Sequence, residues 1–182
     1  MLIDAGAELD GYASDITRSF PVNGRFSAEQ RALYEVVLAA QRAAIAEVRP
    51  GQPFSAPHDT AVRTLTEGLV ALGLLQGDVD ELIAHEDYKP FYMHRTGHWL
   101  GMDVHDVGDY KVGDEWRLFE PGMVTTIEPG LYIAAGSAGV EERWWRIGIR
   151  IEDDVLVTTE GHEVLTVAAA KDIDAIEALM QP

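Results

Sequence analysis

Residues 147–154 read IGIRIEDD, an alternating apolar stretch that ends in three acidic residues. In a strand, successive side chains point to opposite faces, so Ile149 and Ile151 would pack on one face while Arg150 and Glu152 share the other. An ionised carboxylate in such a strand is costly unless it is paired or binds a cation. The stretch therefore predicts a buried strand whose charged face holds an ion pair or a ligand to a cation.

Three further acids lie in similar apolar surroundings. Asp4 follows an apolar pair, Asp15 precedes Ile16, and Glu128 follows the segment VTTI. One acid of this kind usually forms a salt bridge, but four of them with few neighbouring Lys or Arg residues favour a cation site. We therefore expect these three acids and Glu152 to converge in space.

Three of the six histidines lie within twelve positions, at His94, His98 and His105. Gly97 and Gly101 disfavour a helix there, so we expect a strand or a loop. Imidazole and several carboxylates form a donor set that suits manganese, cobalt, iron or zinc better than copper. Because the acids outnumber the needs of one ion, we expect two ions about 3.5–4 Å apart, which would generate a hydroxide nucleophile and polarise a scissile carbonyl. The sequence has no Gly-x-Ser-x-Gly or Walker-type motif that would favour serine or nucleotide chemistry.

The flanking sequence predicts a mixture of strands and helices. Asp10-Gly11 is a hairpin turn signal between strands at 2–6 and 12–20, and Ser27 with Gln30 has the spacing of a capping box that opens a helix. The expected helices lie at 28–48, 57–73, 78–85 and 172–180, and the later strands are a pair at 123–133 and single strands at 145–153 and 155–158. This order of strands, helices and strands indicates an α+β fold.

Composition limits the class of protein and its partners. The chain has 182 residues, 47% of them hydrophobic, which suits one globular domain with a substantial core. Its 31 acidic and 14 basic residues give a net charge of −17, which argues against nucleic acid and anionic membranes as partners.

Because the chain lacks cysteine, a signal-peptide pattern and a long apolar run, we expect a cytoplasmic protein. Residues 2–6 read as an interior strand at the chain start, where ends usually fray, so we expect that an upstream portion is missing.

Five segments together resemble the pita-bread metallopeptidases, in that family's order. They are IDAG at 3–6, GYASDITRSFP at 11–21, GHWLGMDVHDVG at 97–108, EPGM and TIEPGLY between 120 and 132, and GIRIEDD at 148–154. The HWLG form and the RIEDD ending are most similar to bacterial aminopeptidase P. The resemblance implies an α+β pita-bread fold and a metallo-aminopeptidase that hydrolyses the Xaa-Pro bond at peptide N-termini. Two divalent ions would serve as cofactors, with manganese first and cobalt or zinc as alternatives.

The resemblance also implies which residues bind the ions. Asp4 would bind one ion, and Asp15 and Glu152 would bridge both. His98 and Glu128 would complete the shell of the other ion. All five ligand positions are therefore filled in this sequence, which disfavours the creatinase-like branch that shares the fold without these ligands.

Further roles in catalysis follow from the same resemblance. Glu128 would move a proton from water to the leaving amine, which needs a base within hydrogen-bond reach. His94 and His105 would hold the substrate carbonyl and stabilise the charge that develops on its oxygen. Arg150 would hold Glu152 in its orientation without itself binding a metal ion.

The resemblance finally sets expectations for the whole protein. Family members carry an N-terminal domain and a first part of the catalytic domain before the first ligand, so residues 1–182 would be a catalytic domain that lacks both. The substrate would be a peptide with proline in second position, and the full-length form would be a homo-oligomer. Two alternatives stay open, namely a prolidase that cleaves Xaa-Pro dipeptides and a non-catalytic module that binds peptides.

Overall fold

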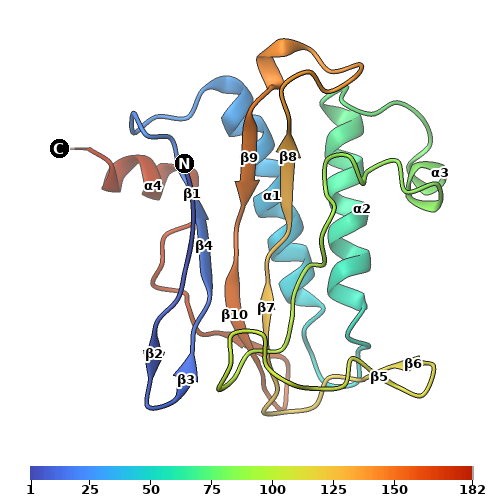
Figure 1. The fold of residues 1–182 in the computed structure, drawn as a ribbon, viewed down its shortest axis with the longest axis vertical. Helices are drawn as coiled ribbons and strands as arrows, with labels where there is room; N and C mark the ends of the chain where they lie inside the picture. The colour runs from blue at the N-terminus through green and yellow to red at the C-terminus, as the bar shows by residue number, and fades with distance from the viewer. Residues whose placement is uncertain (182) are drawn as a thin grey trace.

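The computed structural model describes residues 1–181, which form antiparallel strands with two long helices packed behind them (Figure 1). The helices are α1 (Ala28–Ala46), α2 (Ala56–Ala71), α3 (Val79–Ala84) and α4 (Ile173–Leu179), with a 3-10 turn η1 (Glu142–Trp144). The strands are β1 (Leu2–Ala5), β2 (Glu8–Leu9), β3 (Tyr12–Ala13), β4 (Ile16–Ser19), β5 (Lys111–Val112), β6 (Glu115–Trp116), β7 (Val124–Ile127), β8 (Gly130–Ile133), β9 (Ile147–Arg150), β10 (Asp153–Val157) and β11 (His162–Val164). The α+β class expected from the sequence is confirmed.

The four helices lie where the sequence predicts them, within two residues at most of their ends. Ser27 and Gln30 form the capping box at the start of α1, each side chain accepting a hydrogen bond from the other residue's backbone N–H. Helices α1 and α2 approach closely at Gly68, where an added Cβ would lie 2.3 Å from a methyl carbon of Val36. Among residues 1–181, no helix combines the length and the apolar character needed to cross a membrane.

The main difference from the expected strands is that two long strands are interrupted at the same level. Residues 128–129 separate β7 from β8, and residues 151–152 separate β9 from β10. Strand β7 pairs with β10 and β8 pairs with β9, so the strands at 123–133 pair with the 145–157 segment instead of with each other. Pro129 contributes to the interruption because it has no N–H to donate to a neighbouring strand.

The N-terminal strands show a third interruption. The expected strand at 12–20 divides into β3 and β4, with Ser14 and Asp15 between them. The hairpin turn at Asp10-Gly11 is confirmed, and both residues have positive φ angles of 53° and 84°. Strand β1 pairs with β4 and places Asp4 opposite Thr17. The expectation of an interior first strand is wrong for the described residues, because β1 pairs with β4 alone and is largely exposed.

Candidate metal centre

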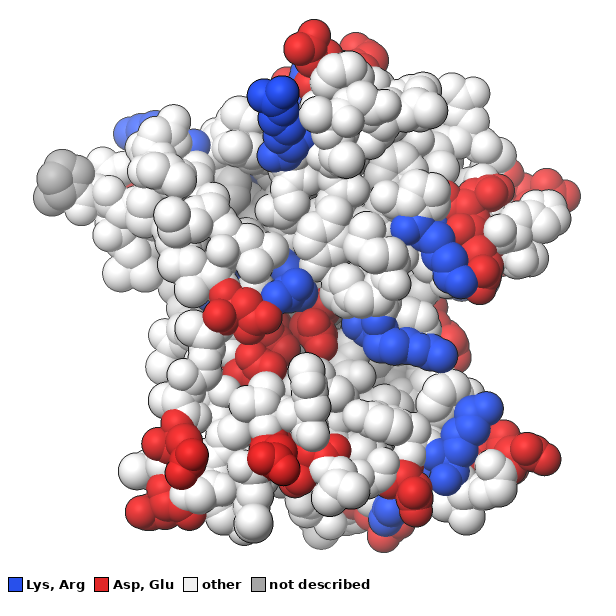
Figure 2. Space-filling view, viewed as in Figure 1, with Lys and Arg blue, Asp and Glu red and all other residues white. Residues whose placement is uncertain are grey.

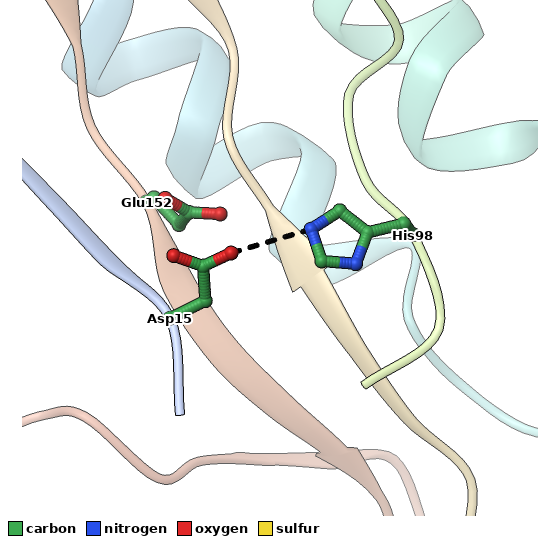
Figure 3. Close-up of side chains that lie close together, drawn as sticks. All are labelled: Asp15, His98 and Glu152. Atoms are coloured by element: carbon green, nitrogen blue, oxygen red, sulfur yellow. Dashed lines mark ion pairs between the residues drawn. The ribbon is translucent and has the colours of Figure 1, made fainter. Parts of the chain in front are cut away.

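The three strand interruptions bring acids from distant parts of the chain together. Asp15 precedes β4, Glu128 follows β7, and Glu152 lies between β9 and β10. Figure 3 shows Asp15, Glu152 and His98 pointing towards one another, with His98 on the loop before β7. One potential ligand atom from each of these three residues lies within 4.8 Å of the others.

The remaining two expected ligands lie beside this group. Glu128 Oε1 is 3.7 Å from His98 Nε2, and Asp15 Oδ2 is 3.4 Å from the same nitrogen. Asp4 lies close enough to hydrogen bond with Asp15 and also accepts a hydrogen bond from Arg150 Nη2 at 2.5 Å. The structure therefore gathers all five side chains, although Asp4 is exposed on β1 and not buried as the sequence suggested.

The backbone of each interruption is fixed by a third segment. The Glu128 N–H donates to the Thr96 carbonyl at 2.7 Å, and the Glu152 N–H donates to the Thr17 carbonyl at 3.1 Å. The Asp15 N–H donates to Asp154 Oδ2 at 3.2 Å. Each acid thus leaves the regular pairing of its strand but keeps its backbone donor satisfied.

The orientation of His98 fits a role as a cation ligand. Nδ1 lies 3.0 Å from the Trp99 carbonyl, which can only accept, so Nδ1 carries the proton and donates. The other ring nitrogen, Nε2, faces Asp15 and Glu128. A neutral imidazole whose second nitrogen is fixed in this way is a common metal ligand.

The acids of the centre are electrostatically unfavourable on their own. Burial, followed by the charge of neighbouring Glu128, raises the pKa of Glu152 to about 8. Burial also raises the pKa of Glu128 to about 7 and, together with Asp4, raises the pKa of Asp15. Divalent cations would favour the ionised carboxylates. The donor set, with its oxygens and one imidazole nitrogen, therefore fits divalent metal ions.

Arg150 does not contact Glu152 directly, which corrects the expected side-by-side arrangement. Its Nε donates to Thr17 Oγ1 at 3.1 Å, and the Thr17 hydroxyl donates to Glu152 Oε2 at 2.5 Å. Arg150 Nη2 binds Asp4, and Nε lies 3.8 Å from Glu128 Oε2. Because β9 ends at Arg150, strand alternation does not extend to Glu152, and Thr17 links the two side chains instead.

The two other expected catalytic histidines lie beside the centre. His94 Nδ1 is 2.7 Å from the Arg95 carbonyl, so it donates, and Nε2 accepts from the Tyr132 hydroxyl at 2.7 Å. Both nitrogens of His94 are thus engaged within the chain. The exposed His105 ring lies 4.3 Å from the His98 ring, measured between centroids.

A network around His58 was missed by sequence reasoning. His58 Nδ1 lies 2.8 Å from Thr96 Oγ1, which lies 2.6 Å from the Tyr92 hydroxyl. Burial, followed by the charge of Arg95, lowers the pKa of His58 to about 4, so its imidazole is neutral. The network therefore fixes the loop that carries His94, His98 and His105 against helix α2. A single His in a helix gives no sequence signal for such a contact.

A cavity of about 730 Å³ opens beside the centre. Its wall includes Asp4, His94, His98, His105, Glu128 and Arg150, together with Phe54, Arg95, Trp116 and Phe119. Figure 2 shows acidic side chains gathered in the hollow middle of this face, with basic atoms directly above them. A cavity of this size is suitable for a small molecule or a short peptide.

The paired strands, the two helices behind them and the acids that meet at the strand interruptions define the pita-bread fold of the metallopeptidases. The chain belongs to metallopeptidase family M24, whose family model matches residues 1–159. The fold class expected from the sequence is therefore confirmed.

Similar proteins cover the whole of this chain but are much longer. The Xaa-Pro aminopeptidases of Haemophilus influenzae and Escherichia coli K12 are each 53% identical over 180 residues, or 99% of this chain and 41% and 40% of the relatives. The solved structure of Pseudomonas aeruginosa aminopeptidase PepP is 63% identical with a TM-score of 0.97, and the match covers 98% of this chain and 40% of that one. The chain thus spans about two fifths of the length of these relatives. The resemblance to bacterial aminopeptidase P is confirmed.

Proposed function

We propose that this chain is the catalytic portion of a metal-dependent Xaa-Pro aminopeptidase, which releases the N-terminal residue of peptides with proline second. The observation that carries the proposal is the gathering of five potential ligands, from the three strand interruptions, from β1 and from the loop before β7. The names of the similar proteins support the substrate class. The adjoining cavity supports a peptide-sized ligand.

We assign the ligands to two ions. Asp15 and Glu152, which lie within 4.8 Å of each other and of His98, would be shared by both ions, and Asp4 would bind one of them. His98 and Glu128 would complete the shell of the other ion. When bound, the ions supply Lewis acidity that activates water and polarises the scissile carbonyl. The oxygen-rich donor set favours manganese, with cobalt or zinc as alternatives.

The chain's own residues contribute proton transfer and orientation. Glu128 Oε1 lies 3.7 Å from His98 Nε2 at the centre, and there it would accept a proton from water and return it to the leaving amine. The exposed His105 is placed to donate to a carbonyl oxygen in the cavity. His94 would take part after exchanging its hydrogen bond with Tyr132 for one with the substrate. Arg150 orients Asp4 directly and Glu152 through Thr17.

Peptide turnover in the presence of manganese tests the proposal. The full-length protein, supplied with manganese, should release the first residue of Xaa-Pro-Xaa tripeptides, and chelation of the metal should abolish this release. Cleavage of Xaa-Pro dipeptides alone would assign the protein to the prolidases. Metal binding without any cleavage would favour the module that only binds peptides.

The location and assembly of the whole protein belong to the same proposal. We propose a cytoplasmic protein that forms a homo-oligomer. Fractionation of cells and light scattering of the purified full-length protein test these two points. Recovery outside the cytoplasm, or a monomeric mass, would contradict them.

A further inference from the structure

Two cations without an ion-pair partner among the described residues lie together over Trp116, and of this group Arg95 and Trp116 line the cavity. Of the 14 Lys and Arg residues, ten form ion pairs with acids among residues 1–181. The other four are Arg25, Arg95, Lys111 and Arg146. Two of these four, Arg95 and Lys111, lie over the same ring, that of Trp116. In a chain with 31 acids, two neighbouring cations without an acidic partner are unexpected and point to a ligand.

The geometry holds both cations in place. The Arg95 guanidinium carbon lies 5.5 Å from the centroid of the Trp116 ring, and Lys111 Nζ lies 4.8 Å from it. Lys111 and Trp116 are opposite each other in the β5–β6 hairpin. Arg95 adjoins Thr96, which is buried and bound to His58 and Tyr92. A cation over an aromatic face is held there while its N–H groups stay available to a ligand.

We propose that Arg95 and Lys111, held by Trp116, bind the C-terminal carboxylate of a short peptide whose N-terminal end lies at the metal centre. This inference rests on the proposed aminopeptidase function and predicts that, among its substrates, the enzyme prefers short peptides with a free C-terminus. A guanidinium suits this ligand because its planar N–H groups can form two parallel hydrogen bonds with a carboxylate. Arg95 and Trp116 line the same cavity as Asp4, His98 and Glu128, so one ligand can reach both ends.

The charge distribution shows why such a site is needed. The chain carries a net charge of −17, and the metal-centre end of the cavity is itself acidic. A peptide carboxylate would be repelled from this surface unless local cations offset the field. The cavity wall also includes Phe54 and Phe119, which suit the apolar part of a proline-containing peptide.

A peptide series tests the inference with the metal-loaded protein. Steady-state kinetics compare Ala-Pro-Ala, its C-terminal amide Ala-Pro-Ala-NH2, and Ala-Pro-Asp-NH2, whose only carboxylate is a side chain. We expect the Ala-Pro-Ala amide to have about tenfold lower kcat/KM than the free acid, mainly through KM, because it loses a charge-assisted contact at a partly exposed site. The Asp amide should not recover the loss. Equal values for acid and amide overturn the inference, and full recovery by the Asp side chain overturns its assignment to the C-terminus.

Matched variants link the effect to these residues. Arg95→Gln and Lys111→Gln should each reduce the preference for the free acid, and the double variant should abolish it, whereas Arg95→Lys should keep part of it. Arg143→Gln is the control, because Arg143 also lies over a tryptophan, Trp144 at 5.3 Å, but neither residue lines the cavity. A double variant that keeps the full preference would contradict the inference.

A binding measurement separates this inference from the proposed function. Calorimetry compares Pro-Ala with Pro-Ala-NH2, which match the part of the peptide that carries the C-terminus. If the protein cleaves neither tripeptide, the proposed aminopeptidase function fails. Even then, tighter binding of Pro-Ala that is lost in Arg95→Gln would support the carboxylate site, and equal binding of both dipeptides would overturn it.

Discussion

Glu152 and Asp153 are neighbours in sequence and both are buried, yet their surroundings are electrostatically opposite. Glu152 faces other acids, and burial together with Glu128 raises its pKa to about 8. Burial also opposes ionisation of Asp153, but hydrogen bonds from cations outweigh it and lower the pKa of this carboxyl. The donors to Asp153 are Arg18, Lys171, Gln41 and Thr166, at 2.6–2.8 Å.

The difference shows two ways of stabilising a buried carboxylate. Asp153 is satisfied by side chains from β4, α1 and the segment before α4, and it joins these elements. The Glu152 carboxylate accepts a hydrogen bond from one hydroxyl, that of Thr17, and otherwise faces the acids of the centre. The first acid therefore stabilises the fold by itself, whereas the second depends on the proposed metal ions.

Removal of Asp153 is the strongest test of this comparison. Asp153→Ala should lower the free energy of unfolding by about 3–5 kcal/mol, because it removes a buried carboxylate and leaves the partly buried Arg18 and Lys171 without their acidic partner. Chemical denaturation of the metal-free protein measures the change. Asp172→Ala removes an exposed ion pair with Arg42 and should cost less than about 1 kcal/mol. Equal losses in the two variants would refute the structural role of Asp153.

The pH dependence of stability should have opposite signs for the two acids. Since the folded state raises the pKa of Glu152 from 4.5 to about 8, the folded protein keeps a proton that the unfolded chain has lost. The free energy of unfolding of the metal-free protein should therefore fall as pH rises from about 5 to 8, by on the order of a few kcal/mol. The contribution of Asp153, whose pKa is lowered, is present above its unfolded value of 3.8 and is lost at more acidic pH.

Denaturation in chelator at a series of pH values measures this profile. The fall between pH 5 and 8 should be smaller in Glu152→Gln, which cannot titrate. A profile that does not change between wild type and this variant would show that Glu152 is not protonated in the folded metal-free state.

Manganese should offset the electrostatic cost of ionising Glu152 beside the other acids of the centre. At a concentration one hundred times its Kd, the ion should stabilise the protein by about 2.7 kcal/mol through preferential binding to the folded state. Asp15→Asn should lose most of this gain, because a neutral amide is a poor bridge between two cations. Thermal unfolding with and without manganese measures the shift, and the exposed Asp114→Asn serves as control. A full shift in Asp15→Asn would contradict the assignment of Asp15.

The smallest expected effect concerns the hydroxyl that links Arg150 to Glu152. Thr17→Val should lower the free energy of unfolding by about 1–2 kcal/mol and weaken manganese binding, because a buried oxygen of Glu152 loses its donor. Thr17→Ser keeps the hydroxyl and should retain metal affinity. Titration of manganese by calorimetry compares the two. If both variants bind as tightly as the wild type, the hydroxyl does not orient Glu152.

Local patterns were sufficient to predict much of the fold. The capping box at Ser27, the Asp10-Gly11 turn and the helical spacing of apolar residues depend on neighbours in sequence, and the structure shows all of them. The gathering of the acids was also predictable, because several acids in apolar segments with few cations nearby would be too costly to bury unless they shared a cation site.

The features that sequence reasoning missed depend on contacts between distant segments. Asp153 is paired with Arg18, which is 135 residues away, and nothing in the acidic run at 152–154 distinguishes it from Glu152. At the strand interruptions, backbone N–H groups donate to acceptors on other segments instead of to the neighbouring strand. The short strands β5, β6 and β11 have two or three residues each, too few to show an alternating pattern.

The strand interruptions also have a consequence for the time scale of local motion. Amide protons in paired strands exchange with solvent only when a cooperative unit opens, whereas those of Asp15, Glu128 and Glu152 are each held by a single contact to another segment. These three amides therefore report on the order of the centre itself. Their deuterium uptake should slow when ions cross-link the acids, while the uptake of α1 and α2 changes little.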